Sequence, residues 1–283
     1  MASQCHSKEF CVVTLTYIFQ HKDIKLHFRK IGSGKTPIVA FHGFTRSSVD
    51  YELFEPFIKD DYTIFAIDLF YHGKTQFNSK KWKSFSKKEL KEIFEAFLKH
   101  IEVKRFQVLG YSMGGRVALF LIEQFAKRVD HLYLLAPDGL KTNFWNWFVT
   151  STKAGKGIYG LAISNPGIVY SISNTGQKLN LFPSSMNQFL DINFSTKGLR
   201  LRIYRVWQLY KNISLPQYKL AEIINDNSIK TDIIVGHKDP VVKPELCEKF
   251  YLKIEENATF HKIKAGHDLF RPHVINFFKN NIF

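Results

Sequence analysis

The chain has 283 residues, of which 45% are hydrophobic and 15% aromatic, and its formal net charge is +15. This composition excludes an intrinsically disordered chain and supplies enough apolar side chains for one large core with an insertion. A charge of this size attracts polyanions, but the lysines are scattered along the chain and favour a solvated surface. We therefore expect a small-molecule substrate and no nucleic acid as the partner.

The cysteines predict neither a disulfide framework nor a metal site. Cys5, Cys11 and Cys247 have no metal-ligand spacing and are odd in number, which is typical of reduced thiols in the cytoplasm. The apolar residues 10–19 lack the basic flank and cleavage site of a signal peptide, and no run reaches the roughly 18 to 20 apolar residues of a membrane span. We predict a cytoplasmic protein with no stable membrane insertion, no cofactor and no metal; the oligomeric state is left open.

Strands and helices are predicted to alternate along most of the chain. Residues 11–19 and 23–29 should form an antiparallel strand pair at a sheet edge. A helix is expected after Ser86, which forms a capping box with Glu89. Continuous apolar runs typical of strands buried on both faces occur at residues 38–41, 62–67, 106–109, 131–135 and 232–235. The predicted fold class is α/β, with a mostly parallel, doubly wound sheet.

The alternation breaks between about residues 139 and 216. Aromatic residues there lie among Gly, Ser and Asn without a strong strand pattern. Because a structureless stretch of this length is rare inside a sheet fold, a helical insertion is predicted. We assign residues 1–138 and 216–283 to the core domain and residues 139–215 to a helical cap or lid.

Residues 110–115, Gly-Tyr-Ser-Met-Gly-Gly, carry the strongest chemical signal. They fit the G-x-S-x-G nucleophile elbow, in which a serine occupies a strained turn between a strand and a helix. A buried strand precedes the motif and an amphipathic helix follows it, as the elbow requires. The glycines suit a crowded turn. Ser112 is the predicted nucleophile.

A serine hydroxyl needs a base, and the base needs a buried carboxylate to orient it. His267 follows the strand-like run at residues 258–263, so it should lie with Ser112 at the carboxyl edge of the sheet. Asp239 follows a buried strand and gives the chain order Ser, Asp, His expected of this architecture. Asp138 is the competing candidate for the acid.

Acyl transfer also requires two hydrogen-bond donors for the oxyanion. The backbone N–H of Met113 is one candidate by position, and the N–H of Phe44, in the loop after residues 38–41, is the other. His42 is expected to brace this loop rather than to act as a base. The Gly34-Lys35-Thr36 run precedes a strand instead of linking a strand to a helix, which excludes a phosphate-binding loop.

These motifs together resemble the α/β-hydrolase superfamily with a cap domain, over nearly the whole chain. The segments that carry the resemblance are the elbow, His42-Gly43-Phe44, Asp68-x-x-x-His72-Gly73-Lys74-Thr75, Gly236-x-x-Asp239 and Gly266-His267. The chain departs from the family at Tyr71, where Gly is usual, and at Thr75, which replaces Ser. Both departures fall in a turn outside the predicted triad.

The predicted reaction is hydrolysis of carboxylic esters of small apolar or aromatic acyl groups through an acyl-enzyme on Ser112. The aromatic insertion would cover the pocket as a lid.

Two alternatives stay open. Residues 110–118 resemble the menaquinone-pathway lyase that forms succinyl-hydroxycyclohexadiene carboxylate, the SHCHC synthase. Arg116 matches an arginine of that family, in which arginines bind substrate carboxylates, and Phe44 matches its loop. That resemblance implies a lyase, or a related carbon–carbon bond hydrolase, using the same triad. The second alternative is a non-catalytic small-molecule receptor.

Overall fold

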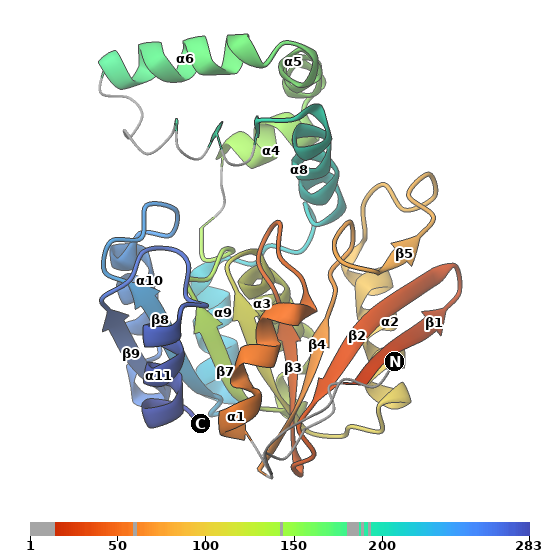
Figure 1. The fold of residues 1–283 in the computed structure, drawn as a ribbon, viewed down its shortest axis with the longest axis vertical. Helices are drawn as coiled ribbons and strands as arrows, with labels where there is room; N and C mark the ends of the chain where they lie inside the picture. Colours follow the sequence, from red (N-terminus) through yellow and green to blue (C-terminus); the bar gives the residue numbers. More distant parts are fainter. Residues whose placement is uncertain (1–14, 59–60, 142–143, 180–186, 188–189, 192–193) are drawn as a thin grey trace, which may run out of the picture.

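A computed structural model describes residues 15–58, 61–141, 144–179, 187, 190–191 and 194–283 (Figure 1). A nine-stranded sheet has the order β1-β2-β4-β3-β6-β7-β8-β9, and β5 pairs with β2 beside this path. The strands are β1 (Leu15–His21), β2 (Ile24–Ile31), β3 (Thr36–Phe41), β4 (Tyr62–Ile67), β5 (Gln76–Phe77), β6 (Phe106–Tyr111), β7 (Val129–Leu135), β8 (Lys230–Gly236) and β9 (Ala258–Ile263). The predicted α/β fold class is confirmed.

The sheet is antiparallel at one edge and parallel elsewhere. β1 pairs antiparallel with β2, and β2 pairs antiparallel with β4 and β5. All pairs from β4 to β9 are parallel. The predicted edge pair is therefore present, although residues 11–14 lie outside the described part of the chain. β3 lies at the centre with Ile38 and Phe41 fully buried, which explains its unbroken apolar run.

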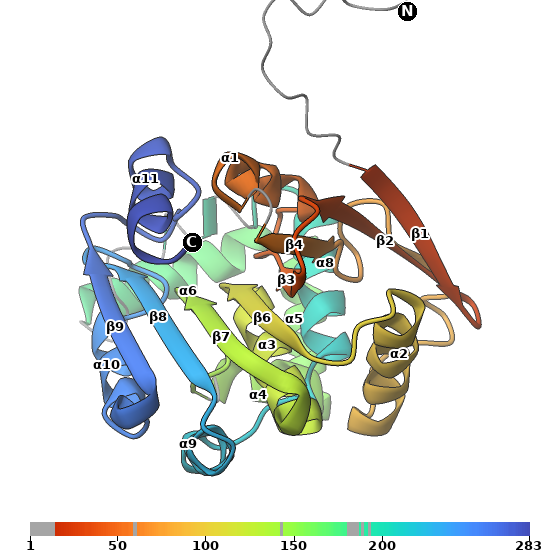
Figure 2. The same cartoon turned by 90° about the horizontal axis from the view of Figure 1, so that it is seen from below.

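Helices cover both faces of the sheet. Figure 2 shows α1 (Glu55–Ile58) and α11 (Pro272–Asn281) on one face and α2 (Lys87–His100), α3 (Met113–Phe125) and α9 (Gln217–Asp226) on the other. α10 (Pro244–Tyr251) lies beside β8 and β9, and short 3-10 helices are present at η1 (Ser48–Phe54), η2 (Ala126–Arg128) and η3 (Glu255–Asn257). The predicted capping box is present, since the Ser86 and Glu89 side chains each bond the other residue's backbone N–H.

The insertion is helical in the part that the structure describes. Its helices are α4 (Phe144–Ser151), α5 (Lys153–Ser164), α6 (Pro166–Lys178) and α8 (Lys197–Leu209). Figure 1 shows them stacked above the end of the sheet from which α3 begins. They share a small buried cluster of Val149, Tyr159, Leu190, Phe194 and Ile203. This cluster is separate from the core around the sheet.

The loop after β4 is organised around Asp68. Its carboxylate accepts hydrogen bonds from the backbone N–H groups of Ser48 at 2.7 Å and Lys74 at 2.8 Å, and it bonds His27 Nδ1 at 2.8 Å. Tyr71, where the family usually has glycine, has φ of +65°. Bulky residues rarely adopt this conformation. The loop therefore keeps the backbone path of a glycine-containing turn at the cost of local strain.

Candidate active site

Ser112 occupies a strained turn between β6 and α3. Its φ of +50° and ψ of −117° leave the usual regions for an L-residue. The turn is also crowded, because a Cβ placed on Gly114 would lie 1.9 Å from the carbonyl oxygen of Phe41 on the neighbouring strand. Only glycine fits so close to another backbone. The local sequence thus forces the serine hydroxyl out of the sheet at the start of the helix.

The structure brings the three predicted polar residues into one hydrogen-bonded chain. Ser112 Oγ lies 2.9 Å from His267 Nε2, and His267 Nδ1 lies 2.7 Å from Asp239 Oδ2. A carboxylate can only accept, so Nδ1 carries the proton and the lone pair of Nε2 faces the serine hydroxyl. In this tautomer the imidazole can take the proton of Ser112.

Asp239 is held from two sides in the loop after β8. Its side chain is fully buried, and Oδ1 accepts hydrogen bonds from the N–H groups of Val241 and Val242, both at 2.8 Å. These contacts satisfy one carboxylate oxygen and leave Oδ2 for His267. A buried carboxylate with fixed partners orients the imidazole without rotating away.

Asp138, the competing acid, lies in a different interaction. Its carboxylate forms an ion pair with Arg116, at 2.9 Å between Oδ2 and Nη2, and its side chain is about two-fifths exposed, at 42%. His267 Nδ1 is bonded to Asp239 instead. In this structure Asp138 is therefore the partner of an arginine on α3.

The loop after β3 lies directly against Ser112. A Cβ on Gly43 would lie 3.3 Å from the Cβ of Ser112. Phe44 follows that glycine, and Met113 begins α3, where the first N–H groups of a helix have no partner within it. The two predicted oxyanion donors thus come from a loop that lies against Ser112 and from the residue that follows Ser112 in the chain.

His42 braces this loop, as the sequence predicts. Its Nε2 accepts a hydrogen bond from the N–H of Leu69 at 2.9 Å, so its Nδ1 donates to the carbonyl of Gly43 at 2.7 Å. Burial lowers the pKa of His42 to about 4, which keeps the ring neutral. Both ring nitrogens are used for structure, and His42 ties the loop after β3 to the loop after β4.

Two further side chains hold the His267 loop, and the motifs gave no signal for either role. The Tyr111 hydroxyl donates to the carbonyl oxygen of His267 at 2.9 Å. Arg46 is ion-paired with Asp268 and, at 3.0 Å, with Asp50. Its guanidinium also lies over the ring of Tyr111, 5.6 Å from the centroid. The pairing with Asp268 joins the loop after β3 to the residue that follows His267.

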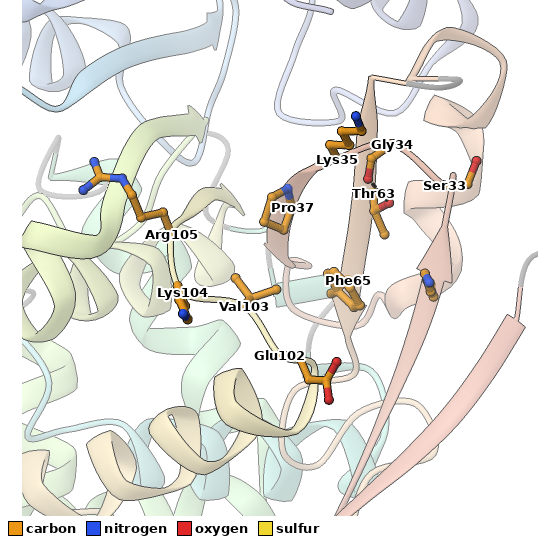
Figure 3. Close-up of a pocket in the computed structure, with 11 residues that line it drawn as sticks. Ser33, Gly34, Lys35, Pro37, Thr63, Phe65, Glu102, Val103, Lys104 and Arg105 are labelled. Atoms are coloured by element: carbon orange, nitrogen blue, oxygen red, sulfur yellow. Dashed lines mark hydrogen bonds between the residues drawn. The ribbon is translucent and has the colours of Figure 1, made fainter.

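A cavity of about 340 Å³ lies at the opposite, amino edge of the parallel strands (Figure 3). Gly34 and Lys35 line it together with Lys30, Lys104 and Arg105, so it is basic. A Cβ on Gly34 would lie 2.1 Å from the backbone of Asp61, so this glycine serves close packing between two loops. This agrees with reading the Gly34-Lys35-Thr36 run as a structural loop.

The described residues contain no group of three or more His, Cys, Asp or Glu that could hold a metal ion. In the same residues, no helix combines the length and apolar character needed to cross a membrane. Cys247 is buried, and burial raises the pKa of its thiol to about 12. Cys5 and Cys11 lie outside the described residues.

A family model described as the alpha/beta hydrolase fold matches residues 36–273, most of the chain. The chain therefore belongs to the α/β-hydrolase family, and the resemblance inferred from its motifs is confirmed. A thermophilic esterase from Thermogutta terrifontis shares the fold with a TM-score of 0.64 and 16% identity, covering 95% of this chain and 97% of that one.

Curated relatives match a shorter stretch. The chain is 32% identical over 109 residues to the dihydrolipoyllysine-residue acetyltransferase component of the acetoin cleaving system of Pseudomonas putida, covering 38% of this chain and 29% of that protein. It is 33% identical over 109 residues to a Bacillus subtilis protein provisionally named 2-succinyl-6-hydroxy-2,4-cyclohexadiene-1-carboxylate synthase, covering 37% and 38%. It is 31% identical over 109 residues to the pimeloyl-acyl-carrier-protein methyl ester esterase of Legionella pneumophila, covering 38% and 41%. The matches span less than half of each relative.

Proposed function

We propose that the chain is a serine hydrolase of carboxylic esters with small apolar or aromatic acyl groups. The observation that carries the proposal is the continuous relay from Ser112 through His267 to Asp239, with distances of 2.9 Å and 2.7 Å. Its α/β-hydrolase family and its likeness to an esterase fold are consistent with this chemistry. We retain a cytoplasmic location as part of the proposal.

The proposed reaction has two acyl-transfer steps. His267 takes the proton of Ser112 as its Oγ attacks the ester carbonyl, and the resulting imidazolium is stabilised by Asp239. The N–H groups of Phe44 and Met113 bond the developing oxyanion. His267 then protonates the leaving alcohol and activates a water molecule, which releases the acid and restores Ser112.

We also propose residues 139–215 as the cap that covers the acyl site, with residues 1–138 and 216–283 as the core domain. Phe44 supports this division, because its side chain packs against both the core around the sheet and the small cluster of the insertion. The residue proposed as one oxyanion donor thus contacts the insertion through its ring. An apolar wall at this position favours an apolar or aromatic acyl group.

The lyase alternative depends on Arg116 as a carboxylate-binding residue. Its guanidinium is already paired with Asp138, and its Nη2 bonds both oxygens of that carboxylate at 3.1 Å and 2.9 Å. A substrate carboxylate would have to compete with Asp138 for this guanidinium. The pairing therefore favours ester hydrolysis over the lyase or a carbon–carbon bond hydrolase, and turnover itself would exclude the receptor.

The test is hydrolysis of a p-nitrophenyl ester series of rising acyl length at neutral pH. The wild type should turn over with an optimum at short or aromatic acyl groups, and Ser112→Ala should lower kcat by roughly five to six orders of magnitude. Ser164→Ala, at an exposed serine of α5, is the matched control and should behave as the wild type. A wild type that is inert on every ester would overturn the proposal and favour the lyase or the receptor instead.

A further inference from the structure

The outer helices of the insertion expose large aliphatic side chains in a regular arrangement. On α6, Ile168 is 45% exposed and Ile172 is 53% exposed, and Leu179, directly after the helix, is 63% exposed. Spacings of four and seven residues place these three on one side of the helix. On α5, Ile158 and Leu161 are 52% and 59% exposed and lie three residues apart. We call these five residues the cap stripe.

The two helices that carry most of the cap stripe, α5 and α6, contain lysines and no acidic residue. Residues 139–190 contain four lysines, no arginine and no aspartate or glutamate, although the whole chain has 25 acidic residues. Lys141, Lys153, Lys156 and Lys178 are all exposed. A surface helix of a soluble domain normally mixes both signs of charge, because like charges repel. The acidic residue nearest to α6 in the chain is Asp191, which accepts a hydrogen bond from Tyr170 of α6. Aliphatic side chains beside lysines, on helices without an acidic residue, form the composition of a helix that lies in a membrane interface.

The position of α5 and α6 leaves this surface accessible. Figure 1 shows both helices at the end of the molecule farthest from the sheet, beyond α4 and α8. A flat surface can therefore meet them without touching the core. Since α4 and α8 lie between these helices and the sheet, docking there would place the cap, and the edge bearing Ser112, next to that surface.

We propose that the cap stripe and its lysines dock the protein on an anionic lipid surface. The stripe would enter the boundary between headgroups and acyl chains, while the lysines would contact lipid phosphates. A second copy of this chain is a poorer occupant, because it would bring four more lysines against the first four and only Asp191, which Tyr170 already bonds, as an acidic residue beside α6. Docking needs no chemistry at Ser112, so the proposal is independent of the proposed ester hydrolysis.

The test is co-sedimentation of the full chain with lipid vesicles at low salt. Wild type should sediment with vesicles of phosphatidylcholine mixed with phosphatidylglycerol and stay in solution with phosphatidylcholine alone. The double variant Ile168→Ser, Ile172→Ser should lose at least about tenfold in affinity for the mixed vesicles, because two aliphatic side chains no longer enter the interface. Lys156→Glu with Lys178→Glu should weaken binding similarly and reduce its dependence on salt.

Leu252→Ser is the matched control, since Leu252 is 59% exposed but lies at the end of α10 in the core. It should bind as the wild type, and Ser112→Ala should do the same whatever its effect on esters. Unchanged circular dichroism and thermal midpoints would show that the variants are folded. The proposal would be overturned if the wild type does not sediment with the mixed vesicles, or if a stripe variant binds them as well as Leu252→Ser does. A dimer in solution that the stripe variants abolish would also overturn it, in favour of self-association.

Discussion

Side chains and backbone are packed more tightly at the carboxyl edge of the sheet than on the outer face of the helical insertion above it. At the edge, Asp68 and Asp239 each use both carboxylate oxygens in hydrogen bonds, and Gly114 has no room for a methyl group. In the insertion, Gly155 is packed closely against the Phe148 carbonyl oxygen, 2.1 Å from an added Cβ, but a Cβ added to Gly157 or Gly160 would meet nothing within 4 Å, and aliphatic side chains face outward. A site proposed to carry out catalysis needs fixed geometry, whereas the outer helices of the insertion are under no such constraint.

The largest expected effect falls on the fixed edge. Asp239→Asn should lower kcat for ester hydrolysis by about 10,000-fold, because an amide cannot hold His267 in the required tautomer. The fold should survive, since Asn keeps an oxygen for the N–H groups of Val241 and Val242. The measurement is the steady-state rate of the variant against its thermal midpoint. Asp138→Asn is the control, and a larger loss in Asp138→Asn than in Asp239→Asn would reverse the assignment of the acid.

Gly114→Ala should destabilise the protein by about 3 kcal/mol, at the upper end of the usual cost of overpacking. The new methyl group would meet the Phe41 carbonyl oxygen at 1.9 Å, and a backbone group on a central strand cannot move aside. Chemical denaturation followed by fluorescence would measure the change in the free energy of unfolding. An unfolding midpoint equal to that of the wild type would show that the edge is less rigid than its contacts indicate.

A smaller effect is expected at Asp232, a partly buried carboxylate on β8. It bonds His131 at 2.7 Å and His261 at 2.9 Å. Burial alone would raise its pKa, but the two histidines lower it from 3.8 to about 2. A lowered pKa stabilises the fold above the unfolded value, and this contribution is lost as pH falls from about 4 through about 2.

Asp232→Asn should therefore lower the free energy of unfolding by about 1 kcal/mol at neutral pH, because solvent screens part of the interaction of this partly buried carboxylate. The difference from wild type should shrink as the pH is lowered towards 2, where the wild-type carboxyl group is also protonated. Urea titrations of both proteins at several pH values would measure it. A difference that stays constant with pH would mean that packing, and not charge, accounts for the loss.

The smallest expected effect is an increase in the free energy of unfolding, in the insertion. Gly160→Ala, in the interior of α5, should stabilise the protein by about 0.5 to 1 kcal/mol, because alanine is the better helix former and open space surrounds the site. Gly157→Ala should act in the same direction. Denaturant unfolding monitored by circular dichroism is the measurement. Destabilisation by either variant would show that the insertion is packed more tightly than the contacts of its glycines imply.

Local patterns predicted the fold class, and they singled out Ser112, His267 and Asp239, which the structure brings within hydrogen-bond distance of one another. The elbow around Ser112 and the capping box at Ser86 each depend on residues within a few positions of one another, so their spacing is visible in the chain. His267 and Asp239 could be placed because both follow strands of a parallel sheet, whose carboxyl ends meet. The confirmed fold class follows from the same alternation of buried runs and amphipathic helices.

Contacts between distant segments could not be predicted in this way. Arg46 and Asp268 meet because the first and last loops of the carboxyl edge adjoin, and no local spacing encodes that meeting. The pairing of Asp232 with two histidines depends on strand register. The exposure of Ile168 and Ile172 is also not visible in the sequence, because aliphatic residues at helical spacing are equally typical of a buried helix face.

The adjacency of β7 and β8 has a consequence for how the chain folds. The two strands pair in parallel, yet the whole insertion and α9 lie between Leu135 and Lys230 in the chain. During synthesis the sheet from β1 to β7 can assemble first, and β8 with β9 can dock only after the insertion has been made. Because loop-closure entropy grows only slowly with loop length, a shortened insertion should change the order and speed of assembly more than the final stability of the sheet.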